Sequence, residues 1–222
     1  MKPAEDAPVR YEDDTVLVVA KPAGVTVHPG AGTTGDTLVE RLAANRPGLA
    51  QVDRMGLVNR LDKDTSGLVV IAKTEEAKRK LSEQFADRQV KKRYVAVVVG
   101  IPAQPRGVIS APITRHHADR TKMAVRPDGR AAVTEYELRE RLEGYAVLDV
   151  RPSTGRTHQI RVHLAALGHP LVGDRTYGSN ADAKRHLLHA AELSFAHPVT
   201  GRPVRVKDPV PNDLVEFVRD HA

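Results

Sequence analysis

The 222-residue sequence contains no cysteine and no long apolar run. Without cysteine the chain has no disulfide, no thiolate nucleophile and no thiolate metal site, which fits a reducing cytosol. No apolar stretch reaches the ~18 residues that a membrane-spanning helix needs. The first 14 residues, MKPAEDAPVRYEDD, lack the apolar core of a secretory signal. We therefore expect a cytoplasmic protein that does not enter a membrane.

Aromatic side chains make up only 4% of the sequence, and tryptophan is absent. This disfavours a single-strand nucleic-acid binder that stacks successive bases on rows of rings. Basic residues are in excess, with a formal net charge of +6 and a pI of about 9.6. A basic balance favours an anionic partner such as nucleic acid, although many basic proteins bind none.

The apolar runs predict more strands than helices. Continuous apolar stretches bounded by turn residues indicate strands covered on both faces, and alternation around Glu143-Gly144 indicates a hairpin. The predicted strands are 15–22, 67–74 and 92–100, and the hairpin spans 131–152.

Helical periodicity is confined to four segments, 36–45, 74–89, 156–170 and 211–221. We expect Asp36 and Thr74 to be the N-caps of the first two. The balance of elements predicts an α+β (mixed α/β) fold around a largely antiparallel mixed sheet with flanking helices and loops. No repeat or linker divides the chain, so we expect an N-terminal tail at 1–10 and one domain at 11–222.

The stretch NRLDKDTSG (59–67) places four charged side chains directly before an apolar strand. In an extended or looped backbone Arg60, Asp62 and Asp64 would share one side, because residues two apart face the same way, and Leu61 would point into the core. Thr65, Ser66 and Gly67 are suited to fix a turn. The alternative is a solvated charged loop.

The stretch RPSTGRTHQIRVHLAALGHPLVGDRTYG (151–178) forms a second cluster. We expect its helix to open with Arg156, His158 and Arg161 in the first turns, with Ile160, Leu164 and Leu167 on its apolar face. A helix N-terminus with added arginines attracts anions, and a carboxylate docked there would have a lowered pKa. The alternative is a basic helix end exposed to solvent.

The stretch RHHADRTKMAVRPDGR (115–130) carries five basic residues against two acidic ones. Its pattern predicts a basic hairpin or loop whose residues Arg115, Arg120 and Lys122 lie along phosphates. A solvated arm explains the pattern about equally well.

No motif indicates a metal or a nucleotide cofactor. The paired histidines at 116–117 and at 158 and 163 lack the i, i+4 spacing of a helical zinc site. The glycine-rich GAGTTG (30–35) lacks the lysine and hydroxyl of a phosphate-binding P-loop, and we interpret it as a surface loop. We expect neither a metal nor a cofactor.

Five segments, in order, resemble the RluA/RluD family of ribosomal large-subunit RNA pseudouridine synthases, in particular the RluD-like catalytic domain. The resemblance covers nearly the whole chain. The segments are KPAGVTVHPGAG (21–32), RLDKDTSGLVVIAKT (60–74), KKRYVAVVVG (91–100), GRTHQIRVHLAALGHPLVGDRTYG (155–178) and LLHAAELSFAHPVTG (187–201).

The resemblance implies roles for the matching residues. Asp62 matches the catalytic aspartate and Arg161 the arginine that pairs with it. Tyr94 matches the tyrosine placed against the target base, and Arg60 the arginine that fills the gap left by the flipped uridine. With the clusters above, the predicted substrate-binding residues are Arg60, Leu61, Thr65, Arg156, His158, Gln159, Arg115, Arg120 and Lys122.

Two features depart from the family pattern. The family usually has histidine where this chain has Asn59. RluD-like proteins commonly carry an N-terminal S4 RNA-binding domain, whereas this sequence starts almost directly at the first strand of the catalytic domain. We expect either a fragment or a short member.

The resemblance implies an enzyme that isomerises uridines to pseudouridine, most simply in 23S ribosomal RNA, by base flipping and an essential aspartate. RNA is the expected partner and a monomer the expected state. The sequence leaves open which uridine is modified, whether the RNA is ribosomal or transfer RNA, and whether Asp62 first attacks C1′ or C6 or removes the 2′ proton. Two rivals are a non-catalytic RNA-binding module and a carboxylate-based nucleoside or glycoside hydrolase.

Overall fold

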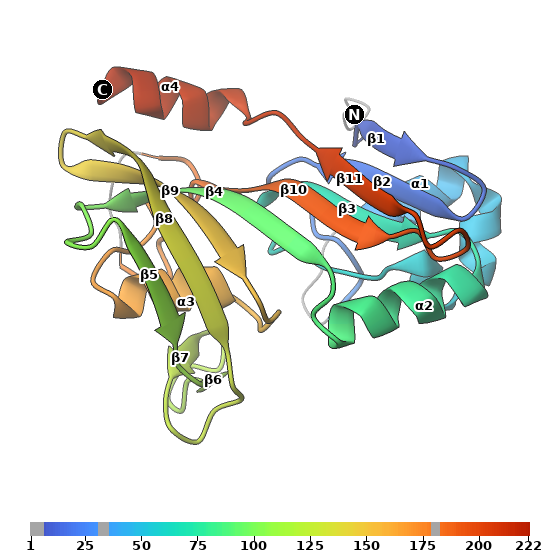
Figure 1. Cartoon of the computed structure of the whole chain (residues 1–222), viewed down its shortest axis with the longest axis horizontal. Coiled ribbons are helices and arrows are strands. Elements are labelled where there is room, and N and C mark those ends of the chain that lie inside the picture. Colours follow the sequence, from blue (N-terminus) through green and yellow to red (C-terminus); the bar gives the residue numbers. More distant parts are fainter. Residues whose placement is uncertain (1–6, 31–35, 179–182) are drawn as a thin grey trace. The chain divides into compact units, whose positions relative to one another are not determined.

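The structure, a computed structural model, describes residues 7–30, 36–178 and 183–222 (Figure 1). The chain divides into two compact units, which are treated separately. The first comprises Met1–Lys91 and Ala190–Pro209, and the second Lys92–His189 and Val210–Ala222. That residues 11–222 form one catalytic domain stays a prediction.

The first unit is built on a sheet whose strand order is β1-β2-β3-β10, with β11 paired to β10. The printed pairs β1–β2, β2–β3 and β10–β11 are antiparallel. Every residue of β2 and β3 is buried, as the continuous apolar runs predicted. The strands are β1 (Val9–Glu12), β2 (Val16–Lys21), β3 (Ser66–Ala72), β10 (Leu188–Ala196, in this unit from Ala190) and β11 (Pro203–Lys207).

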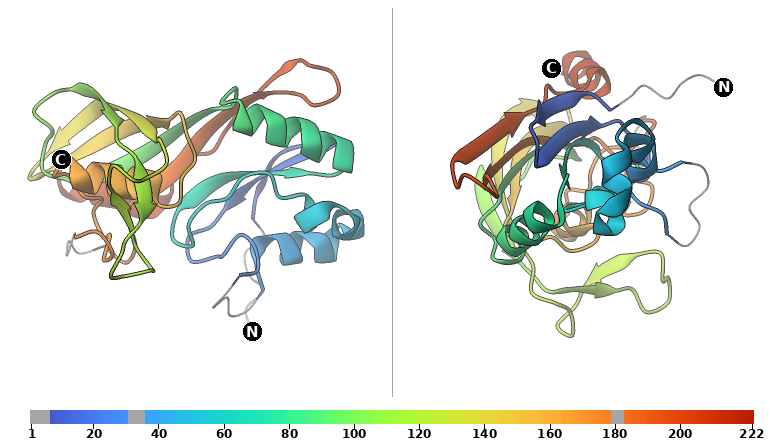
Figure 2. Two further views of the ribbon diagram at one scale, coloured as in Figure 1. Left: turned by 90° about the horizontal axis from the view of Figure 1, so that it is seen from below. Right: turned by 90° about the vertical axis from the view of Figure 1, so that its right-hand side faces the viewer.

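Helices cover both faces of this sheet. On one face, Ala77 and Leu81 of α2 (Glu75–Ala86) pack against even-numbered side chains of β2 and β3. The odd-numbered side chains are also buried, on the side where Figure 2 shows α1 (Leu38–Asn45) and the 3₁₀ turns η1 (Pro47–Gln51) and η2 (Asp53–Gly56).

The caps of these helices were predicted with mixed success. Thr74 caps α2 as expected, because its Oγ1 accepts a hydrogen bond from Ala77 N. The prediction of Asp36 as cap of α1 was wrong by one residue, because Thr37 is the N-cap. The Glu40 carboxylate accepts hydrogen bonds from both the backbone N and the hydroxyl of Thr37, which fixes the start of α1 there.

The second unit contains an antiparallel sheet in the order β4-β9-β8-β5. Its long hairpin turns at Glu143-Gly144, as predicted, and Gly144 has a φ of +73°, which favours glycine. A separate two-stranded sheet, β6–β7, lies in the basic segment. The strands are β4 (Lys91–Val99, in this unit from Lys92), β5 (Arg106–Ser110), β6 (Ile113–Arg115), β7 (Met123–Val125), β8 (Val133–Leu142) and β9 (Tyr145–Pro152).

Two helices complete the second unit. Ile160 and Leu164 of α3 (Gln159–Ala166) join the core formed by β4, β8 and β9. The C-terminal helix α4 (Asn212–Asp220) is tied to the hairpin turn, since Glu143 N donates to His221 O at 2.9 Å.

The predicted α+β class with a mostly antiparallel sheet is confirmed. The predicted strands and helices all occur, with ends that differ by a few residues. β1 begins at Val9, inside the segment 1–10 that was expected to be a tail. Apart from Gly30, the glycine-rich segment 30–35 lies outside the described residues.

Candidate functional site: the Asp62 loop and the Arg161 cluster

The loop that carries Asp62 is hydrogen-bonded to the edge of β3. Val58 N donates to Val70 O at 3.3 Å, and the Asn59 side-chain oxygen accepts from Val70 N at 2.7 Å. Asn59 is the position where the family usually has histidine, and here its amide fastens the loop to the strand.

Asp62 opens a tight turn directly after this anchor. Thr65 N donates to Asp62 O at 3.1 Å, so the chain reverses at Lys63 and Asp64. Leu61 is buried at 6% exposure, as predicted, whereas Asp62 is only partly buried. Of the extended or looped backbone expected here, the structure has the looped form, with the turn at Lys63 and Asp64.

Lys21, the last residue of β2, holds this loop in place and was missed by sequence reasoning. Its side chain is 1% exposed, and its Nζ donates to the carbonyl oxygens of Pro22, Val25 and Lys63 at 2.8, 2.9 and 2.8 Å. Gly24 N also donates to Lys63 O, at 2.9 Å. A buried ammonium therefore fixes the backbone one residue after Asp62. The only signal in the sequence was a lysine closing an otherwise apolar strand.

The remaining predicted residues of this unit are divided between surface and interior. Arg60 is exposed next to Asp62, whereas Thr65 is buried at 2% exposure. Gly67, two positions further, has a φ of +112°, and a Cβ there would lie 2.3 Å from Ala190 O. Glycine is thus required where β3 begins, because the neighbouring backbone leaves no room for a side chain.

The helix of the second cluster starts later than predicted. Arg156 and His158 precede α3 instead of lying in its first turns, and His158 is its N-cap with a φ of +54°. Arg161 does lie in the first turn. Leu167 follows the last helical residue and is 39% exposed, so it does not extend the apolar face.

Gln159 explains the late start. Its side-chain oxygen accepts from Thr154 Oγ1 at 2.7 Å and from Arg156 N at 3.0 Å. Its nitrogen donates to Val133 O at 2.9 Å and Thr134 Oγ1 at 3.0 Å. This buried amide uses all four of its hydrogen-bonding positions on protein groups, which holds 154–156 as a loop. A substrate contact by Gln159 stays a prediction.

Arg161 forms a buried, two-pronged ion pair with Asp174. Nε donates to Oδ2 at 2.8 Å and Nη2 to Oδ1 at 2.9 Å, and the two side chains are 7% and 1% exposed. Asp174 also accepts from Thr176 N and Tyr177 N. Burial acts to raise the pKa of Asp174, but the hydrogen bond and charge of Arg161 outweigh it and lower the pKa. Sequence reasoning assigned Asp174 no role.

Tyr94 lies on β4 opposite Val150 and is packed, partly buried, against the core that includes Ile160. Asp62 and Arg60 belong to the first unit, and Tyr94 and Arg161 to the second. That the aspartate meets the tyrosine and the arginine stays a prediction.

The basic segment is an antiparallel hairpin, as one form of the prediction had it, in which Arg115 pairs with Met123. Arg115 and Arg120 are exposed, and Arg115 Nη1 donates to Arg120 O at 3.2 Å. Lys122 lies 3.8 Å from Asp119, both side chains being about 40% exposed. A hairpin so exposed is accessible to a large anionic partner.

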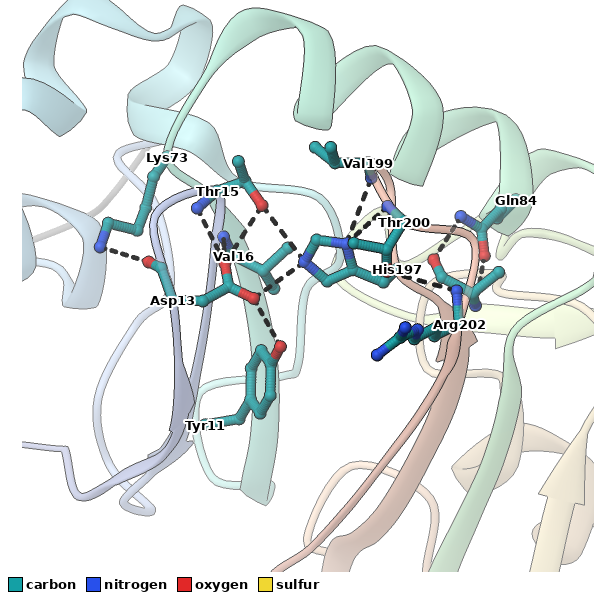
Figure 3. A network of polar contacts seen from close by, with 11 residues as sticks. Tyr11, Asp13, Thr15, Val16, Lys73, Gln84, His197, Val199, Thr200 and Arg202 are labelled. Carbon is teal, nitrogen blue, oxygen red and sulfur yellow. Dashed lines mark hydrogen bonds and ion pairs between the residues drawn. The ribbon is translucent and has the colours of Figure 1, made fainter.

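A histidine–aspartate pair in the first unit resembles a catalytic pair, but the hydrogen-bonding positions of its side chains are used within the protein (Figure 3). His197 Nδ1 accepts from Val199 N and Thr200 N, so the proton sits on Nε2, which donates to Asp13 Oδ2 at 2.8 Å. Asp13 also accepts from Tyr11 and from Thr15. These hydrogen bonds connect the turn between β1 and β2 to the turn between β10 and β11, so this network stabilises the structure.

Residues 7–30, 36–178 and 183–222 contain no group of three or more acidic, histidine or cysteine side chains that could hold a metal. Within the same residues no helix is long and apolar enough to cross a bilayer.

Residues 15–166 match the RNA pseudouridylate synthase family. That span includes the Asp62 loop, Tyr94 and Arg161, and it covers more than half of the sequence. The chain belongs to this family.

Curated relatives carry a more specific name. The chain is 52% identical over 221 residues to the ribosomal large subunit pseudouridine synthase D of Xanthomonas campestris pv. campestris, covering 93% of the chain and 66% of that protein. It is 48% identical over 225 residues to the protein of the same name from Xylella fastidiosa, covering 95% and 68%. The chain thus spans about two thirds of the length of these relatives.

Solved structures agree on the fold. Human RNA Pseudouridylate Synthase Domain Containing 1 aligns with a TM-score of 0.76 at 27% identity, covering 99% of this chain and 98% of that one. Human RNA Pseudouridylate Synthase Domain Containing 4 gives 0.77 at 26% identity, covering 95% and 91%.

Proposed function

We propose that this chain isomerises uridine to pseudouridine in RNA, and that its substrate lies in the 23S RNA of the large ribosomal subunit. The observation that carries the proposal is the Asp62 turn. One carboxylate is presented from a loop whose backbone is fixed on both sides, by Asn59 before it and by Lys21 after it. Such rigidity suits a group that must meet one atom of a substrate.

The reaction is an isomerisation. The N1–C1′ bond breaks, the uracil turns within the site, a C5–C1′ bond forms, the proton on C5 leaves to solvent and N1 takes up a proton, so the composition of the nucleoside is unchanged. The stacked uridine must first leave the RNA helix, which costs a few kcal/mol and costs least in loops. Asp62 provides the carboxylate, acting on C1′, on C6 or on the 2′ proton.

Arg161 is proposed to face Asp62 and to keep it ionised. Asp174 accepts from Nε and Nη2 of this guanidinium and so fixes its orientation. An arginine held by one buried carboxylate has a fixed plane with which to receive a second. Tyr94 is proposed to lie against the uracil and Arg60 to fill the space that the uridine leaves.

RNA contacts outside the reacting nucleoside are proposed for the hairpin residues Arg115, Arg120 and Lys122. Leu61 and Thr65 would shape the Asp62 loop, and Arg156 and His158 would contribute from the loop before α3. No cofactor or metal takes part, because the uracil is retained between bond breaking and bond formation. We further propose a monomer that acts in the cytoplasm, where ribosomal RNA is found.

Tritium release from RNA labelled at C5 of uridine tests the reaction directly. We expect stoichiometric release from large-subunit RNA, unchanged by EDTA on a short substrate that folds without magnesium. RNA binding without tritium release would instead favour a non-catalytic module. Appearance of free uracil would favour a hydrolase with a second carboxylate. Mapping pseudouridines in 23S RNA from cells with and without the gene would identify the site.

A further inference from the structure

Tyr177 contacts three parts of the second unit at once. Its ring lies against the catalytic arginine proposed above, 5.1 Å from Arg161 Cζ. Its hydroxyl shares a 2.8 Å hydrogen bond with His158 Nδ1 and accepts a second from Met123 N at 2.9 Å. The ring also lies edge-on to His158, at 5.7 Å between centroids, so His158 contacts both ring and hydroxyl, whereas Arg161 is contacted by the ring and Met123 N by the hydroxyl.

Met123 is the first residue of β7 and follows Lys122 directly. It pairs with Arg115 across the basic hairpin. The base of the hairpin also packs on α3, because Met123, Val125 and Tyr177 surround a small core of Ile113, Ala132 and Val162. The hydroxyl of Tyr177 thus reaches β7, which directly follows Lys122 and pairs with the strand that ends at Arg115.

We infer that Tyr177 is a positioning residue that couples the basic hairpin to Arg161. Its hydroxyl sets the hairpin, and its ring sets the guanidinium by packing and cation–π attraction. RNA bound by the hairpin would then favour the arrangement in which Arg161 is correctly placed. This inference rests on the proposed function for the roles of the hairpin and the arginine.

The alternative is that Tyr177 only fills space. A phenylalanine would fill the same space and keep the contact with Arg161, so a purely structural role does not need the hydroxyl. The two roles can be separated at one position, with Tyr177→Phe removing the hydroxyl alone and Tyr177→Leu removing hydroxyl and ring. Tyr145→Phe is the matched control, since Tyr145 packs against Phe217 of α4 and against His221, which follows that helix.

The experiment combines steady-state tritium release with amide hydrogen exchange on the full chain. For Tyr177→Phe we expect KM for RNA to rise about fivefold with kcat within about twofold, the size of one lost hydrogen bond. The Met123 amide should exchange faster, since its acceptor is gone. For Tyr177→Leu we expect kcat to fall about 100-fold in addition, with the protein still folded by circular dichroism.

Two results would overturn the inference. One is a Tyr177→Phe protein whose KM and Met123 exchange equal those of the wild type and of Tyr145→Phe. The other is an equal loss of kcat in both Tyr177 variants, because phenylalanine keeps the ring against Arg161 and an equal loss would show that the ring does not set the guanidinium. If the wild type itself releases no tritium, the proposed function fails, whereas hydrogen exchange at Met123 still tests the link between Tyr177 and the hairpin.

Discussion

Two aspartates in this chain, Asp62 and Asp174, occupy opposite kinds of surroundings. Asp174 is 1% exposed and accepts four hydrogen bonds, two of them from Arg161. Asp62 is partly exposed on a turn that is held through its backbone. A carboxylate whose lone pairs are already used is poorly suited to attack a substrate, whereas one presented by a rigid loop is well suited.

The comparison assigns separate tasks to two like groups. Asp174 orients an arginine, and Asp62 is the carboxylate proposed to meet the substrate. The network around Asp13 in the first unit resembles that of Asp174, with donors on both oxygens and a lowered pKa in spite of burial. Asp13 and Asp174 stabilise the structure, and the proposed reactive carboxylate is the partly exposed one on a turn whose backbone is fixed.

Replacing the reactive carboxylate should have the largest effect. We expect Asp62→Asn to lower tritium release at least about 1000-fold, because the amide can neither attack nor accept a proton. RNA affinity should stay within about tenfold, since other groups bind the RNA. Single-turnover assays and filter binding measure the two quantities.

Asp64→Asn is the matched control, with the same change of charge two residues further along the same turn. It should leave turnover within about threefold. Equal losses in both variants would contradict the distinct role of Asp62 and would revive the two-carboxylate hydrolase.

Breaking the buried Arg161–Asp174 ion pair should have the second largest effect. Asp174→Asn removes the charge that Arg161 contacts through both Nε and Nη2, so we expect the free energy of unfolding to fall by about 3–5 kcal/mol. Turnover should fall about 100-fold, because the guanidinium loses its fixed plane. Urea denaturation followed by circular dichroism gives the first value. Unchanged stability would show that the pair is not formed.

The same variant sharpens the comparison through pH. A carboxyl whose pKa is lowered in the folded state contributes stability above its unfolded pKa, ~3.9, and loses it as pH falls through the folded pKa. The wild type should therefore lose stability more steeply than Asp174→Asn below about pH 4.

The sequence made Asp62 a candidate but gave Asp174 no role. Four charges beside a continuous apolar strand are a local pattern in the sequence, and the family resemblance added the expected role of Asp62. Asp174 lies 13 residues from Arg161, and the two meet only because the chain folds back after α3. Lys21 and Tyr177 were missed for the same reason, since all their informative partners are distant in sequence or belong to the backbone.

Some errors were avoidable and others were not. The Thr37–Glu40 spacing is a capping-box signal, so the N-cap of α1 could have been predicted from the sequence. The late start of α3 was not, because it depends on partners of Gln159 that lie 25 and 26 residues away. The exposed strands β1 and β5 were not predicted because they carry few apolar side chains on a buried face.

The hairpin tests whether RNA binding is separable from both aspartates. We expect Arg120→Gln with Lys122→Gln to weaken RNA binding about tenfold at low salt and to reduce the slope of log affinity against log salt by about 1–2. At saturating RNA, kcat should be nearly unchanged. Arg79→Gln with Lys80→Gln on α2 is the matched control, removing the same charges from exposed positions that pair with Glu83 and Glu76.

Lys92 extends the comparison to a partly buried lysine whose ammonium contacts a backbone carbonyl. Its Nζ donates to Thr154 O at 3.2 Å, and burial lowers its pKa from 10.5 to about 8. Between these values the unfolded chain binds more protons than the folded one, so the free energy of unfolding rises with pH, on the order of 1–3 kcal/mol in total.

Lys92→Met should lack this rise and should be more stable than the wild type at pH 7. Lys207→Met, at an exposed position of β11, should change neither. A wild-type stability that does not change from pH 8 to 10 would mean that water reaches the Lys92 ammonium. In that case the burial of Lys92 would not carry the free-energy cost that ion pairing offsets for Arg161 and Asp174.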